Sequence, residues 1–97
     1  MPAFINALRM VKWLKEKLET IRNSIKDEMK KMDIEITNIT YKKDGKYNFL
    51  EIELDKINGI DLNTIVEATN IINPIIDKLD IIDDSYILDI VSKERGN

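Results

Sequence analysis

The sequence predicts an α+β fold, a two-layer α/β sandwich in which two helices cover one face of a three-stranded sheet. A long segment, residues 4–32, carries apolar residues at helical spacing, and a second helix-periodic segment covers 62–79. Apolar and polar residues alternate over 34–41, 47–55 and 86–92, as they do in half-buried strands. The order is therefore α-β-β-α-β. A sheet beneath two helices is the simplest way for these elements to bury their apolar faces.

The first helix is predicted over Phe4–Met32, which contains neither glycine nor proline. Its apolar residues recur at steps of three and four and form one stripe, at positions 4, 7, 8, 11, 14, 18, 21, 25, 29 and 32. Such a helix is about 40 Å long, whereas strands of six or seven residues span only about 20 Å. Half of the helix should therefore extend past the sheet.

A β-hairpin is predicted after this helix. The apolar alternation changes phase between Ile36 and Ile39, which indicates a bulge between them. Residues 43–46 form the predicted turn, because the pair Asp44-Gly45 readily takes the positive φ values of a tight hairpin. The return strand covers 47–55.

The second helix is expected to begin near Asp61–Thr64, and the stretch from Thr64 to Glu67 fits a capping box. Pro74 lies in its interior and should kink or split it. The predicted core face comprises Ile65, Ala68, Thr69, Ile72, Ile75 or Ile76, and Leu79. In the last strand, Tyr86, Leu88 and Ile90 share one face. This strand should run parallel to one of the hairpin strands, and the sequence leaves open which one.

Composition excludes several kinds of chemistry. The 97 residues include no cysteine and no histidine, so disulfides, thiolate catalysis and proton transfer by imidazole are ruled out. No apolar run is long enough to span a membrane, and the first residues lack the layout of a signal peptide. We therefore expect a cytoplasmic protein.

Charge is unevenly distributed along the chain. Residues 1–48 contain 11 Lys/Arg and 7 Asp/Glu, whereas residues 49–97 contain 4 and 11, so the net charge of −3 conceals halves of +4 and −7. The acidic half should repel phosphate and attract a basic partner.

Carboxylates occur in pairs at Glu51/Glu53 and Asp83/Asp84, but the first pair falls on the polar face of a strand and the second in a loop. Neither the spacing of a Ca²⁺ loop nor a glycine-rich phosphate loop is present. We predict no catalytic, cofactor-binding or metal-binding residue, and hence a protein that is not an enzyme.

Three short motifs follow one another along the chain: Leu50-x-Ile-x-Leu-Asp55, Gly59-Ile60-x-Leu62 and Tyr86-Ile-Leu-Asp-Ile90. In this order and spacing, residues 18–92 resemble the N-terminal domain of the RimP family of ribosome maturation factors. Residues 1–17 then form an N-terminal helical extension and 93–97 a polar tail. The chain departs from the family pattern at Asn70, where the family usually has Arg. Residues 91–94 depart as well, because Ser-Ser-Pro-Gly is missing there. The family's C-terminal barrel domain has no counterpart here, and the sequence leaves open whether the chain is complete.

The resemblance implies a binding module that assists assembly of the small (30S) ribosomal subunit through contact with a basic ribosomal protein. Charge and motif position select the candidate contact residues Asp55, Asp61, Glu67, Asp77 and Asp80. Basic residues of the first helix and of the hairpin tip could make a secondary contact with rRNA.

Two alternatives remain open at this stage. The stripe at the start of the first helix follows heptad-like steps, which favours a self-associating helical scaffold that dimerises through residues 4–18. Small α-β-β-α-β domains also include KH-type RNA-binding domains, but their Gly-x-x-Gly loop is absent from this sequence.

Overall fold

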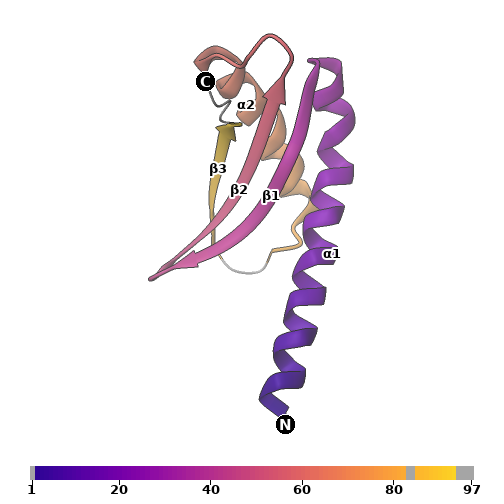
Figure 1. Cartoon of the computed structure of the whole chain (residues 1–97), viewed down its shortest axis with the longest axis vertical. Helices are drawn as coiled ribbons and strands as arrows, with labels where there is room; N and C mark the ends of the chain where they lie inside the picture. The colour runs from indigo at the N-terminus through magenta and orange to yellow at the C-terminus, as the bar shows by residue number, and fades with distance from the viewer. Residues whose placement is uncertain (1, 83–84, 94–97) are drawn as a thin grey trace.

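The computed structural model describes residues 2–82 and 85–93, with side chains from residue 14 onward. Its elements, drawn in Figure 1, are α1 (Pro2–Lys31), β1 (Ile34–Asp44), β2 (Tyr47–Lys56), α2 (Leu62–Leu79) and β3 (Ile87–Ser92). The predicted α+β fold and its α-β-β-α-β order are confirmed.

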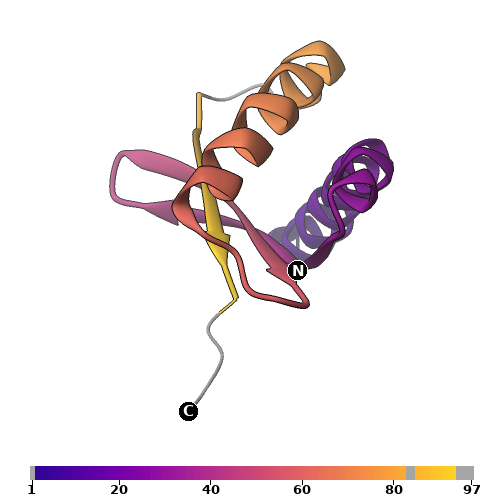
Figure 2. The same ribbon diagram turned by 90° about the horizontal axis from the view of Figure 1, so that it is seen from above.

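The sheet has the strand order β1-β2-β3. β1 and β2 pair in antiparallel orientation, and β3 runs parallel to β2. This answers the question that the sequence left open, because the last strand lies beside the second hairpin strand and makes β2 central. Figure 2 shows both helices on the same side of the sheet, so the molecule has two layers.

The core lies between the sheet and the two helices, with β2 at its centre. Leu50, Ile52 and Leu54 of β2 are fully buried. Against them pack buried residues of α1 (Ile21, Ile25 and Met29) and of α2 (Ala68, Ile72 and Ile76). The part of the α1 stripe within the core is thus its C-terminal part, and the N-terminal half of α1 extends past the sheet as expected (Figure 1).

The predicted bulge in β1 is confirmed. The pairing of β1 with β2 shifts register between Ile36 and Asn38, so Thr37 is the inserted residue. Its hydroxyl oxygen lies 3.1 Å from the Glu53 backbone oxygen and 2.7 Å from Glu53 Oε1. These contacts connect the bulge to the central strand.

The hairpin turn lies one residue later than predicted. Asp44 pairs with Tyr47, so the two central residues of the turn are Gly45 and Lys46. Gly45 has φ +62°, whereas neither Asp44 nor Lys46 takes a positive φ. Glycine at the first central position is typical of a type II′ turn, whose twist matches that of the flanking strands.

The start of α2 also differs from the predicted capping box. Asp61 is the N-cap, and its carboxylate accepts hydrogen bonds from Thr64 N at 2.8 Å and Thr64 Oγ1 at 2.7 Å. Thr64 is therefore the third residue of the helix and cannot be its cap.

Pro74 does not split α2, which is continuous from Leu62 to Leu79. Proline leaves the carbonyl four residues earlier, that of Asn70, without its helical partner. Both residues are exposed, so water can hydrogen-bond to this carbonyl.

Candidate partner-binding surface

The face of the sheet turned away from the helices is uncovered by any described element (Figure 2). Its side chains alternate with the buried residues of the strands. We call this surface the open face. It comprises Glu35, Asn38, Thr40, Lys42 and Asp44 of β1, Tyr47, Phe49, Glu51, Glu53 and Asp55 of β2, and Ile87, Asp89 and Val91 of β3.

Negative charge dominates the open face. Six of its residues are acidic, namely Glu35, Asp44, Glu51, Glu53, Asp55 and Asp89, whereas Lys42 is the one basic residue that the three strands contribute to it. Two acidic pairs are direct neighbours across strands, Glu35 with Asp55 and Glu51 with Asp89. Because paired strands lie about 4.8 Å apart, like charges in these positions repel one another and destabilise the sheet.

Glu51 and Glu53 each have a contact within the described part of the chain. Lys42 Nζ lies 3.8 Å from Glu51 Oε2, and both side chains are partly exposed, which makes this a weak ion pair. Glu53 is held by the Thr37 hydroxyl. The Thr40 hydroxyl oxygen, in the residue opposite Glu51, is buried and has no hydrogen-bond partner among the described atoms.

The hairpin end of the open face carries an apolar cluster, with Asp44 opposite Tyr47 at the tip. Tyr47 and Phe49 of β2 contact each other with ring centroids 6.5 Å apart. Phe49 pairs with Ile87 of β3. Tyr47 and Ile87 are 60% and 45% exposed, respectively. The open face therefore has an apolar cluster near the hairpin, next to Asp44 at the tip, and an acidic row beyond this cluster.

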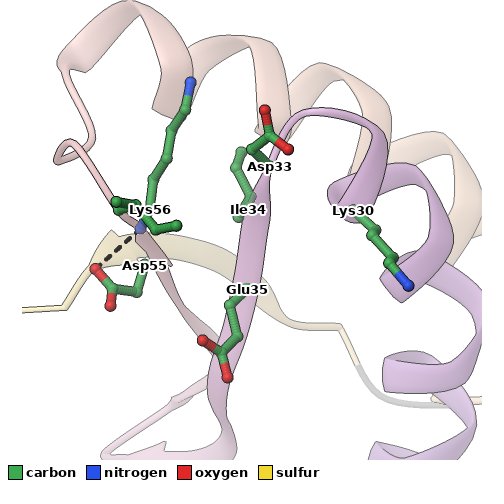
Figure 3. A pocket seen from close by; sticks show the side chains of 7 residues that line it. Lys30, Asp33, Ile34, Glu35, Asp55 and Lys56 are labelled. Atoms are coloured by element: carbon green, nitrogen blue, oxygen red, sulfur yellow. Dashed lines mark hydrogen bonds between the residues drawn. The ribbon is translucent and has the colours of Figure 1, made fainter.

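A shallow hollow of about 220 Å³ lies at the acidic end, around the start of β1 and the end of β2. It is lined by Lys30, Asp33, Ile34, Glu35, Asp55, Lys56 and Ile57. The Asp55 carboxylate accepts a hydrogen bond from Lys56 N at 2.9 Å. In Figure 3 the charged ends of Lys30 and Lys56 point away from each other, and the carboxylates do not converge on a common point.

Within the part of the chain that the structure describes, no three acidic, histidine or cysteine residues are grouped as metal ligands. Neither described helix combines the length and apolarity that crossing a lipid bilayer requires.

Of the five predicted contact residues, only Asp55 lies on the open face. Asp61 caps α2, and the hydrogen bonds from Thr64 lower the pKa of its carboxyl group. Glu67 is exposed on α2. Asp77 and Asp80 lie near the other end of this 18-residue helix, about 27 Å from Asp61.

Asp77 and Asp80 form a second, smaller acidic site together with Tyr86. These three residues line a hollow of about 60 Å³ whose other lining residues are isoleucines. Burial raises the pKa of Tyr86, and the negative charges of Asp77 and Asp80 raise it further. The five predicted residues therefore do not form one site, although Asp77 and Asp80 lie together. Of the acidic pairs considered in the sequence, Asp83/Asp84 lies outside the described residues.

Five acidic residues of the open face were missed as contact residues: Glu35, Asp44, Glu51, Glu53 and Asp89. The alternation in β2 places Glu51 and Glu53 opposite the core, but this pattern alone cannot tell a functional face from a merely hydrated one. The missing information was the strand order, because it is the parallel pairing of β3 with β2 that brings Asp89 beside Glu51.

A comparison with protein-family models agrees with the resemblance seen in the sequence. The model of the RimP N-terminal domain matches residues 24–93. The matched range begins within α1, includes all three strands and α2, and covers 70 of the 97 residues. The chain therefore belongs to the RimP N-terminal domain family, a family of ribosome maturation factors.

Proposed function

We propose that this chain is a binding module that assists assembly of the small (30S) ribosomal subunit by contacting a basic ribosomal protein. Its membership of the RimP N-terminal domain family supports a role in ribosome maturation. The contact with a basic protein is supported by the open face, where six carboxylates lie on a sheet surface that no described element covers.

Charge provides the physical basis for this role. A lysine- and arginine-rich protein is attracted to the open face over a distance set by ionic strength, which accelerates encounter and makes association sensitive to salt. Cations placed near Glu51 and Asp89 also relieve the repulsion between these neighbouring residues. Binding therefore removes an unfavourable interaction of the free domain.

The other predicted acidic residues are secondary contacts in this proposal. Asp77 and Asp80 can receive a basic side chain beside Tyr86, and Glu67 is an exposed charge on α2. The Asp61 carboxylate is already engaged in capping α2. We therefore expect Asp61 to act mainly through the helix it caps.

The test is a salt titration of binding to purified basic proteins of the small subunit. We expect the affinity to fall steeply as salt rises, and the double variant Glu51→Gln, Asp89→Asn to weaken binding at low salt by about fivefold. The matched control carries Glu16→Gln and Glu19→Gln, because these changes also remove two acidic charges, both exposed on α1 and outside the open face. Affinity that is independent of salt, or equal losses in the double variant and the control, would contradict the proposal.

We also propose self-association through residues 4–18, because the N-terminal half of α1 extends past the sheet (Figure 1) and its sequence carries an apolar stripe. Sedimentation should detect a dimer that Leu8→Asp converts to a monomer. A strict monomer in both proteins would exclude this second mode of action.

A further inference from the structure

We propose that the open face binds an extended segment of its basic partner, with cationic side chains at every second residue and one apolar side chain ahead of them. This inference rests on the proposed function, because it specifies the shape and residue pattern of the basic segment. The ligand class is an extended peptide of the pattern apolar-x-Arg-x-Lys/Arg-x-Arg lying along β2.

The spacing of the carboxylates on β2 is the first reason. Glu51, Glu53 and Asp55 recur at every second residue of the central strand, so they repeat at about 6.8 Å. An extended peptide has the same repeat, which places successive cations opposite successive carboxylates.

A helical partner matches this spacing less well. Three cations on one helix face, at positions i, i+4 and i+7, span about 10.5 Å, whereas Glu51 and Asp55 are separated by about 13.6 Å along the strand. The spacing thus favours an extended segment over a helix.

The neighbouring strands create two kinds of position along the acidic row of β2. At the two ends of the acidic row, a second carboxylate lies beside the first, as Asp89 does beside Glu51 and Glu35 beside Asp55. Two adjacent carboxylates suit the several donors of a guanidinium group. Glu53, at the middle position, has Asn38 and Val91 as its neighbours and offers a single charge. We therefore expect arginine at the two outer positions, with either lysine or arginine between them.

The apolar cluster fixes where the segment lies. Two residues before Glu51, Phe49 packs against Tyr47 and pairs with Ile87. An apolar side chain of the partner, two residues from its first arginine, covers this exposed cluster.

Lys42 of the open face opposes a bound cation. It pairs with Phe49 in register and forms its ion pair with Glu51 at 3.8 Å. A bound arginine takes over the contact with Glu51 and displaces Lys42. Removing this lysine should therefore strengthen binding.

Three fluorescent peptides test the inference against the full chain by anisotropy at low ionic strength. The first is Leu-Ser-Arg-Ser-Arg-Ser-Arg, the second has the same composition with its three arginines adjacent, and the third is an alanine-based helix with arginines at i, i+4 and i+7. We expect the alternating peptide to bind about fivefold more tightly than either of the others. Lys42→Ala should strengthen its binding about twofold, whereas Lys26→Ala, which removes an exposed lysine of α1, should not.

The outcomes separate this inference from the proposed function. Equal affinity of the alternating and block peptides overturns the inference, because charge alone then decides binding. Failure of all three peptides beside strong, salt-sensitive binding of a basic small-subunit protein also overturns the inference but leaves the proposed function intact. Tighter binding of the helical peptide overturns the extended conformation. If neither the peptides nor the small-subunit proteins bind, both proposals fail together.

Discussion

The two faces of β2 are formed by the same ten residues, but the face toward the helices is apolar and the open face is largely acidic. Leu50, Ile52 and Leu54 point to the helices and are fully buried, whereas Glu51 and Glu53 point to the open face. A strand places consecutive side chains on opposite sides, so one segment can supply both the core and a binding surface. This comparison shows that a substitution at one position should change stability and a substitution at the next should change binding.

The largest expected effect is on the buried face. Ile52→Ala should destabilise the domain by about 2–5 kcal/mol, because it leaves a cavity among fully buried side chains. Urea denaturation followed by circular dichroism measures this change. Glu53→Ala, at the adjacent position, serves as the control and should cost much less. Equal losses at the two positions would show that the two faces of β2 do not differ as described.

The next effect concerns the cap of α2. Asp61→Ala removes the acceptor for Thr64 N and should lower Tm by several degrees at pH 7. The folded pKa of Asp61 lies below its ordinary value of 3.8. The carboxylate thus contributes its full stability above pH 3.8, and this contribution is lost as the pH falls through the folded pKa.

Thermal melts at pH 7 and pH 2 test whether the stabilising contribution of the Asp61 carboxylate is lost at low pH. The difference in Tm between the wild type and Asp61→Ala should shrink at the lower pH. Asn63→Ala, which changes a polar residue in the same helical turn but keeps the cap, should show no such pH dependence. A difference in Tm that stays constant with pH would contradict the capping role of the charged carboxylate.

The smallest effect has the opposite sign and lies on the open face. Neutralising the adjacent charges with Glu51→Gln and Asp89→Asn should raise the free energy of unfolding by a few tenths of a kcal/mol. Such a gain in stability with a loss of function is common at binding sites. Chemical denaturation at low salt, where repulsion is screened least, provides the measurement. A loss of stability would mean that these two carboxylates do not repel each other in the folded domain.

The sequence predicted the elements well because their periods are local properties. The apolar steps of α1 and the phase change that marks the bulge at Thr37 need no knowledge of the rest of the chain. The turn was misplaced by one residue, because Gly45 can occupy either central position and only the pairing of Asp44 with Tyr47 decides between them.

The candidate site depended on tertiary structure, and most of it could not be predicted. Asp55 was chosen from its motif and does lie on the open face. Asp61 was also chosen from its motif, but its carboxylate caps α2. Glu35 and Asp89 are distant in sequence from β2 and become its neighbours only through strand pairing. A charge pattern along the chain therefore indicated an acidic protein but not the surface on which the charges meet.

The most direct test of the central claim is an NMR titration of the ¹⁵N-labelled chain with a basic protein of the small ribosomal subunit. We predict that the amide signals of residues 49–55 and 87–91 shift or broaden first, while those of the exposed side of α2 near Glu67 change little. Perturbations confined to α2 and its ends, with the signals of β2 and β3 unchanged, would contradict the assignment of partner binding to the open face.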